Sequence, residues 1–192
     1  MYIKPLIDSG KTVFSLDDLR LLWRIDNPSY LKTVTGRLFR RGEIKRISHG
    51  LYVLNDRFDI LELANKIKFP SYVSLETVLR NAGVVFQDTG NTIFSVSNDS
   101  LSREVAGHAF VYATLRDTIL SNPLGIEHRE MAMIATPERA LCDRLYLSPN
   151  TSFDNVRALD PKKLLALSTL YNARTEQEIK NIIHAIKRHV ER

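Results

Sequence analysis

The chain is poor in residues and patterns that mark several classes of protein. It has one cysteine, Cys142, which excludes an internal disulfide. No apolar run reaches the roughly 18 residues that suggest a membrane-spanning helix. The N-terminal sequence MYIKPLIDSGK also lacks the apolar stretch of a signal peptide. We therefore expect a cytoplasmic protein that does not interact with a membrane.

Patterns typical of nucleotide or metal sites are equally scarce. The segment Gly10-Lys11-Thr12 lacks the upstream glycine of a phosphate-binding loop. The closest pair of histidines, His184 and His189, would point about 140° apart on a helix, which disfavours a shared zinc ion. We expect neither a cofactor nor a metal.

Enzymatic signals are weak as well. Two Glu-Ile-Lys triplets, at residues 43–45 and 178–180, mimic part of a metal-dependent nuclease site, but neither follows an aspartate on an expected neighbouring strand. Cys142 and His128 are conceivable as a nucleophile and its base. The apolar helical surroundings of Cys142 instead favour a buried, inert thiol. An enzyme is therefore the least supported functional class.

The charge of the chain is concentrated at one end. With 192 residues, 44% of them apolar and 26% charged, the chain is globular and has room for one large or two small domains. Residues 1–57 hold eleven Lys and Arg against six Asp and Glu, whereas residues 58–192 hold sixteen of each. The whole formal excess of +5 lies in the first part, which argues for a polyanionic partner.

Two helices joined by a short turn are expected in this basic part. The segment Leu16–Trp23 has an apolar stripe, and Ser15 before it can act as the N-cap. After a turn at residues 24–28, in which Asn27-Pro28 opens the next helix, a helical pattern runs through Tyr30–Arg41. A further short helix, Ile3–Asp8, is expected to close the bundle.

A β-hairpin is expected directly after the second helix. Gly42 ends the helix, and a basic strand, a tight turn at His49-Gly50 and an apolar strand follow. Helix, turn, helix and hairpin is the layout of a winged helix-turn-helix, in which the second helix enters the major groove of DNA and the hairpin is the wing. Residues 1–57 are therefore predicted to be a DNA-binding domain.

The second helix has one face for packing and one face suited to DNA. Leu31, Val34 and Leu38 share the packing face with Thr35. The opposite face combines small residues with cations, which allows close approach to the major groove and bidentate Arg–guanine pairs. The hairpin cations suit phosphates or the minor groove. The predicted DNA-binding residues are Ser29, Lys32, Thr33, Arg37, Arg40, Arg41, Lys45, Arg46 and His49. The alternative is a solvated amphipathic helix beside a surface hairpin.

The rest of the chain is predicted to be an α+β domain spanning residues 58–192. The boundary is expected at Asn55-Asp56-Arg57, where the hairpin ends in a polar turn. The alternation of apolar and polar residues predicts strands at 91–97, 109–115 and 130–135. Helical patterns predict a linking helix at 59–68, a helix capped by Ser74, a helix opened by Thr136-Pro137, and closing helices near 161–171 and 175–191.

Two segments of this second part resemble a known family. They are Ser71–Thr77, SYVSLET, and Thr136–Asp143, TPERALCD. Together with the order of the elements, they make the stretch Lys11–Tyr146 similar to the AbiEi antitoxins of bacterial type IV toxin–antitoxin systems. The resemblance implies a winged helix that represses its own operon by binding operator DNA with repeats. It also implies a second domain that opposes a nucleotidyltransferase-type toxin, by direct or indirect contact.

The Thr136–Asp143 segment has two interpretations. Thr136 suits the N-cap and Pro137 the first position of a helix, and Arg139 can pair with Asp143 four residues later. The segment is then simply a capped, packed helix. The alternative is a toxin-facing surface made by Glu138, Arg139 and Asp143.

The C-terminal helix is ambiguous. Its apolar stripe fits a helix docked on its own domain, a dimer or toxin interface, or, with its flanking cations, a second DNA contact; the stripe contains Ile179, Ile182, Ile183, Ile186 and Val190.

The sequence as a whole favours a non-enzymatic antitoxin and autorepressor. The alternative is a winged-helix regulator without a toxin, whose second domain senses a ligand or mediates assembly.

Overall fold

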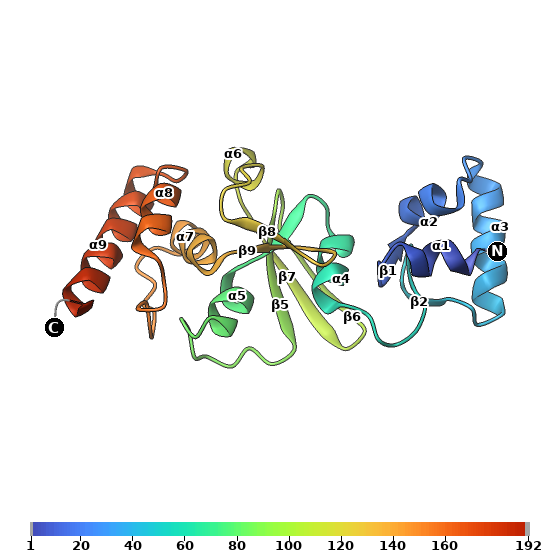
Figure 1. Cartoon of the computed structure of the whole chain (residues 1–192), viewed down its shortest axis with the longest axis horizontal. Helices are drawn as coiled ribbons and strands as arrows, with labels where there is room; N and C mark the ends of the chain where they lie inside the picture. The colour runs from blue at the N-terminus through green and yellow to red at the C-terminus, as the bar shows by residue number, and fades with distance from the viewer. Residues whose placement is uncertain (1, 191–192) are drawn as a thin grey trace. The chain divides into compact units, whose positions relative to one another are not determined.

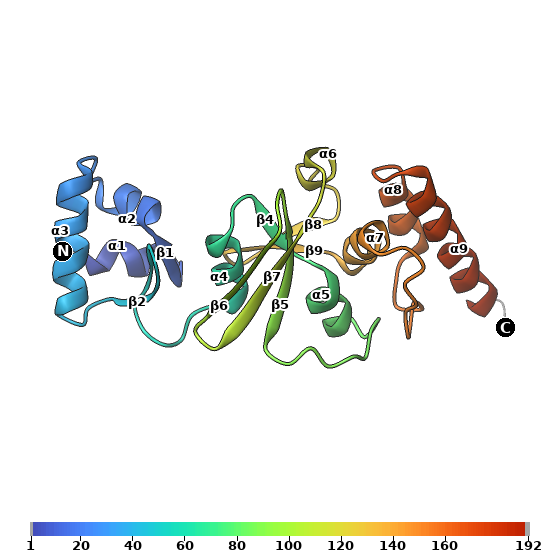
Figure 2. The same ribbon diagram turned by 180° about the vertical axis from the view of Figure 1, so that it is seen from behind.

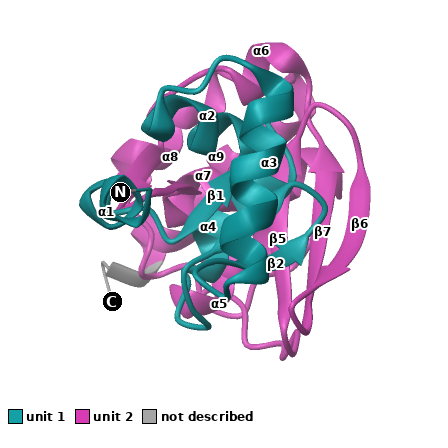
Figure 3. Cartoon of the chain, turned by 90° about the vertical axis from the view of Figure 1, so that its right-hand side faces the viewer, with its two compact units in different colours: residues 1–69 teal, residues 70–192 magenta. Residues whose placement is uncertain are grey.

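The computed structural model describes residues 2–190 and shows a mixed α+β protein. The chain divides into two compact units, residues 1–69 and residues 70–192 (Figure 3). Within the described residues, no helix combines the length and the apolar character that crossing a membrane requires.

The first unit packs three helices beside a small antiparallel sheet whose strand order is β1-β3-β2 (Figure 1). Its elements up to residue 53 are α1 (Ile3–Asp8), β1 (Val13–Ser15), α2 (Leu16–Trp23), α3 (Pro28–Arg40), β2 (Lys45–Ser48) and β3 (Leu51–Val53). The helices and the hairpin lie where the sequence predicts them. Strand β1 is not predicted, because three residues are too few to show an alternation.

Side-chain caps set where α2 and α3 begin. Ser15 accepts a hydrogen bond from the backbone N–H of Asp18, and the Asp18 carboxylate accepts one from the N–H of Ser15, which completes a capping box. Asn27 caps α3 by accepting from the N–H of Tyr30, and Pro28 occupies the first helical position. The predicted packing face of α3 is buried against a core that contains Phe14, Leu19, Trp23, Leu31, Val34 and Leu38.

Helix α4 (Ile60–Ile67) belongs to the first unit, so the predicted boundary at residues 55–57 lies too early. The buried carboxylate of Glu62 accepts hydrogen bonds from the backbone N–H and the hydroxyl of Thr12, at 2.8 and 2.6 Å, and from the N–H of Val13. Lys66 pairs with Asp18 at 2.6 Å. These contacts join α4 to the start of β1 and to α2. The sequence pattern of α4 alone does not predict such contacts with distant residues.

Asp18 is the centre of this polar cluster. Its carboxylate pairs with Lys11 and Lys66 and closes the capping box with Ser15. Burial by itself raises the pKa of Asp18, but the hydrogen bonds from Lys11, Lys66 and Ser15 outweigh burial and hold the pKa well below its usual value. The charged form of Asp18 is therefore part of the folded state.

We expect Asp18→Asn to destabilise the first unit by about 1–2 kcal/mol at neutral pH. Because the folded-state pKa is depressed, Asp18 stabilises the fold above its unfolded pKa, near 4. That stabilisation is lost as the pH falls towards the folded-state value. Acid unfolding followed by the fluorescence of Trp23, the single tryptophan, should thus depend less steeply on pH in the variant. Asp17→Asn, with a side chain 90% exposed, should keep the wild-type profile. An unchanged acid profile for Asp18→Asn would contradict this role.

The second unit is built on a six-stranded mixed sheet whose order is β6-β7-β5-β4-β9-β8. Strands β4 and β9, and β5 and β7, pair in parallel, and the other neighbours are antiparallel. The strands are β4 (Ser71–Val73), β5 (Thr92–Ser97), β6 (Leu101–Val105), β7 (His108–Thr114), β8 (Ile126–Arg129) and β9 (Ala132–Ala135). The three predicted strands correspond to β5, β7 and β9, whereas β4, β6 and β8 are not predicted.

Helices cover this sheet and extend the unit away from it. Helix α7 packs against α5 and against the pair α8 and α9 (Figures 1 and 2). The helices are α5 (Leu75–Asn81), α6 (Asp117–Leu120), α7 (Pro137–Leu147), α8 (Pro161–Ser168) and α9 (Ala173–Val190). In α9 the side chains of Ile179, Ile183 and Ile186 are buried, as expected for a helix docked on its own domain. The side chain of Val190 and residue 191 lie outside what the structure describes.

Candidate nucleic-acid interface

The predicted DNA-binding residues of α3 form one exposed surface. On a helix of 3.6 residues per turn, Ser29, Thr33 and Arg40 point directly away from the buried face. Lys32 lies on the edge that faces the hairpin, and Arg37 lies on the opposite edge. All nine predicted residues, from Ser29 on α3 to His49 in the hairpin turn, are exposed. The surface is therefore available to a partner.

Helix α3 and the hairpin line a common hollow of about 320 Å³. Lys32 and Gly36 contribute from the helix, and Arg46 and His49 contribute from the hairpin. No atom outside the helix lies within 4 Å of the position that a Cβ on Gly36 would take, so the absent side chain leaves the helix surface open. Phe39, which is not among the predicted DNA-binding residues, is 48% exposed and also lines the hollow.

The hairpin cations make exposed polar contacts that a phosphate can replace. A terminal nitrogen of Arg46 is 3.0 Å from Nδ1 of His49, and the Nε of Arg46 donates to the carbonyl of Ser48. Lys45 pairs with Asp56 at 2.5 Å, with both side chains at least half exposed. Exposed ion pairs of this kind contribute little to stability. Lys45 can therefore leave Asp56 and bind a DNA phosphate at a low cost in free energy.

The predicted partner-binding residues are not on the surface. Glu138, Arg139 and Asp143 in α7 are 5%, 0% and 0% exposed. A toxin-facing surface made by these three side chains is therefore excluded, and the interpretation as a capped, packed helix is correct. Thr136 caps α7 by accepting from the N–H of Arg139, and Arg139 and Asp143 form the predicted ion pair, at 3.3 Å.

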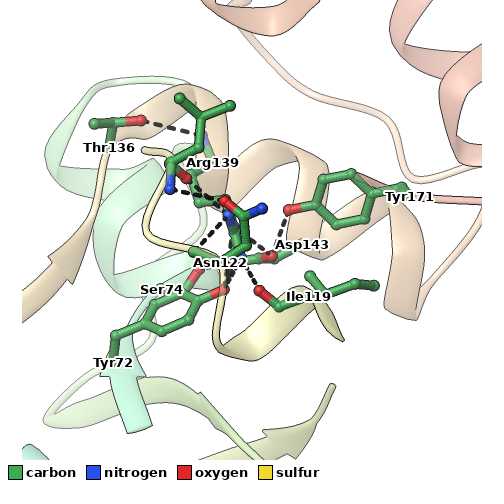
Figure 4. Close-up of polar contacts among 9 residues, drawn as sticks. Tyr72, Ser74, Ile119, Asn122, Thr136, Arg139, Asp143 and Tyr171 are labelled. Atoms are coloured by element: carbon green, nitrogen blue, oxygen red, sulfur yellow. Dashed lines mark hydrogen bonds and ion pairs between the residues drawn. The ribbon is translucent and has the colours of Figure 1, made fainter. Parts of the chain in front are cut away.

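Arg139 and Asp143 are the centre of a buried polar network (Figure 4). The guanidinium of Arg139 donates to the carbonyls of Ile119 and Leu124, both at 2.7 Å, and to the hydroxyl of Tyr72. Asp143 accepts hydrogen bonds from three hydroxyl groups, which belong to Tyr72, Ser74 and Tyr171, at 3.0, 2.8 and 2.7 Å. The network joins β4, α7, α6 with the segment after it, and the segment after α8.

This network corrects the prediction for Ser74. The sequence predicts that Ser74 caps α5, but its side chain makes no capping hydrogen bond and donates to Asp143 instead. The two segments that carry the family resemblance, SYVSLET and TPERALCD, therefore meet in space. Tyr72 and Ser74 of the first satisfy Arg139 and Asp143 of the second. Physically, both segments specify the fold of the second unit.

Electrostatics support an ionised guanidinium in this network. Burial by itself lowers the pKa of Arg139, but the neighbouring carboxyl of Asp143 raises it above the normal value. Complete burial raises the pKa of Asp143, while Arg139 and the three hydroxyl donors oppose that rise. Burial also raises the pKa of the Cys142 thiol, which is completely buried as predicted and is disfavoured as a thiolate nucleophile.

Metal-binding groups do not cluster in the described part of the chain. Among residues 2–190, no group of three or more His, Cys, Asp or Glu side chains is placed to hold a metal ion. The exposed surface on α3 and the hairpin carries cations, hydroxyls and the imidazole of His49, which can donate to phosphate oxygens and base edges.

Comparisons with known proteins give a fold but no family. No protein-family model matches the chain. No curated protein matches it either. Among solved structures, the chain is similar to the crystal structure of the RV2827C protein from Mycobacterium tuberculosis, with a TM-score of 0.52 and 11% identity. The match covers 95% of this chain and 74% of the other. At this identity the similarity concerns the fold alone.

Proposed function

We propose that the first unit is a winged helix-turn-helix that binds double-stranded DNA. In this assignment α2 and α3 are the helix-turn-helix, α3 enters the major groove, and the hairpin of β2 and β3 is the wing. The observation that carries the proposal is the joint surface of α3 and the hairpin, on which every predicted DNA-binding side chain is exposed. The solvated-helix alternative does not account for the shared hollow between the helix and the hairpin.

The charges of this surface fit a nucleic acid. The formal excess of the chain, +5, lies within residues 1–57. Arg40 points outward near the end of α3 and suits a base edge, whereas Lys45 and Arg46 on the hairpin suit phosphates. Ser29 at the start of α3 and Gly36 further along it keep the outward surface of the helix small, which allows the helix to approach the base pairs closely.

We further propose that the chain is an antitoxin that represses its own operon. This rests on the similarity of Lys11–Tyr146 to AbiEi antitoxins, in which a winged helix is followed by a domain that opposes a nucleotidyltransferase toxin. The burial of Glu138, Arg139 and Asp143 moves any toxin contact to other residues of the second unit. The two activities then reside in separate units.

The test uses the full chain with a variant that changes only the proposed DNA surface. This four-cation variant carries Arg37→Ala, Arg40→Ala, Lys45→Ala and Arg46→Ala. The wild type should repress a fusion of its own promoter and restore growth when an adjacent gene with a nucleotidyltransferase signature is expressed. The four-cation variant should restore growth but lose repression. Failure of the wild type to restore growth would refute the antitoxin assignment and leave DNA binding standing.

A regulator without a toxin is the second candidate, and one observation favours it. The second unit has a largely apolar hollow of about 280 Å³ between the start of β8 and α8, lined by residues that include Leu124, Ile126, Lys163 and Leu167. This volume is near the lower end of that of small-molecule sites. A compound that fills the hollow and changes promoter repression would favour this candidate.

A further inference from the structure

The edge of α3 that faces away from the hairpin carries a pair of tyrosines. The hydroxyl oxygens of Tyr2 and Tyr30 are 3.1 Å apart, and the guanidinium of Arg37 lies 5.8 Å from the centre of the Tyr2 ring. Tyr30 and Arg37 are two turns apart and therefore share one edge of the helix. Neither tyrosine is among the DNA-binding residues predicted from the sequence.

Tyr2 is held in place by the core of the first unit. The indole N–H of Trp23 donates to the backbone carbonyl of Tyr2 at 2.8 Å, and the two rings meet edge to face with centres 5.5 Å apart. Tyr30 is 51% exposed and stands in the first turn of α3. The pair is thus fixed on one side and accessible on the other.

The hydrogen-bonding capacity of the pair is not used up within the protein. Each phenol has one O–H donor, and the bond between the two hydroxyls needs only one of these protons. The hydrogen bond with Tyr2 raises the pKa of Tyr30, so the phenol stays protonated at neutral pH. Within residues 2–190 the structure pairs Arg37 with no carboxylate. A neutral O–H donor and an uncompensated guanidinium therefore lie side by side.

We propose that Tyr2, Tyr30 and Arg37 form a second phosphate-binding site of the DNA surface. This inference rests on the proposed DNA-binding function and extends it. The site lies across α3 from Lys45 and Arg46, so a duplex that receives α3 in its major groove is held by its backbone on both sides of the helix. Arg37 then contacts the backbone, and the outward-facing Arg40 remains for base edges.

The experiment measures the affinity of the full chain for two duplexes as salt is varied. One duplex is the DNA upstream of its own gene, and the other is a short duplex of arbitrary sequence. Tyr30→Phe and Tyr2→Phe should each weaken binding to both duplexes about threefold to tenfold. Because a hydroxyl is neutral, the dependence of affinity on salt should stay as in the wild type. Arg37→Ala should instead flatten that dependence by about one unit.

The controls separate contact from folding. Tyr146→Phe removes a phenol hydroxyl from α7 in the second unit and should leave affinity unchanged. The double variant Tyr2→Phe/Tyr30→Phe should bind little more weakly than either single variant, since the two hydroxyls act as a unit. Trp23 fluorescence on heating shows whether the first unit of each variant is folded, and Arg37→Ala tests the site without altering the tyrosines.

The outcomes are distinguishable. Wild-type protein that binds neither duplex overturns both this site and the proposed function. Wild-type binding with unchanged affinities in both Phe variants overturns this site alone. A loss confined to the upstream duplex would mean that the hydroxyls contact bases, which also overturns a phosphate site.

Discussion

Replacement of Arg139 by Met should destabilise the second unit by about 3–5 kcal/mol, because it leaves the buried carboxyl of Asp143 without its cationic partner. The carbonyl of Ile119, in a buried contact, and that of Leu124, in a partly buried one, also lose the guanidinium as a hydrogen-bond donor. A loss of stability of this size lowers the melting temperature of a domain by many degrees. Differential scanning calorimetry can resolve this transition, while Trp23 fluorescence follows the first unit.

Two comparisons make this expectation specific. Arg129→Met is the matched control, because Arg129 pairs with Glu127 at 3.2 Å on the surface and its loss should cost under about 1 kcal/mol. The double variant Arg139→Met/Asp143→Leu should be more stable than the sum of its single variants predicts, since it removes both charges together. A cost below about 1 kcal/mol for Arg139→Met would show that the network is not structurally important.

The four-cation variant should bind its own upstream DNA about a thousandfold more weakly than the wild type. Loss of an Arg that contacts a base costs about 1–3 kcal/mol, and each lost phosphate contact weakens binding to every sequence. Removal of Lys45 and Arg46 alone should flatten the dependence of affinity on salt by about two units. Gel-shift or anisotropy titrations at several salt concentrations measure both quantities.

A variant with the same change in net charge tests whether position or total charge matters. Lys162, Lys163, Lys187 and Arg188 are exposed cations of the second unit. Their replacement by alanine should leave affinity for the upstream DNA within about threefold of the wild type, because none of them belongs to the proposed DNA surface on α3 and the hairpin. Equal losses in the two variants would show that binding depends on net charge and not on the proposed surface.

Local signals were sufficient to predict most helices of the first unit. Ser15 and the Asn27-Pro28 pair cap α2 and α3 through contacts within three residues, so their sequence positions suffice. The 3.6-residue periodicity of the apolar side chains also predicted which face of α3 is buried. The exposed residues that α3 contributes to the candidate DNA surface follow from the same periodicity, because they occupy the complementary face of the same helix.

Features that depend on distant contacts were not predictable. The attachment of α4 to the first unit depends on Glu62 reaching Thr12, fifty positions away. The buried position of Arg139 depends on Tyr72 and Tyr171, which come from other elements. A charged residue in the first turn of a helix is usually solvated, so only the folded structure shows that these two tyrosines surround Arg139.

The most direct test of a DNA-binding role is competition between two duplexes for the wild-type chain at physiological salt. Labelled DNA from upstream of its own gene is bound first, and unlabelled duplex of arbitrary sequence is then added. A sequence-specific winged helix requires about a thousandfold or larger excess of the arbitrary duplex to displace the protein. Displacement by the arbitrary duplex at a concentration equal to that of the upstream DNA, or no binding of the upstream DNA at all, would contradict sequence-specific DNA binding by this protein.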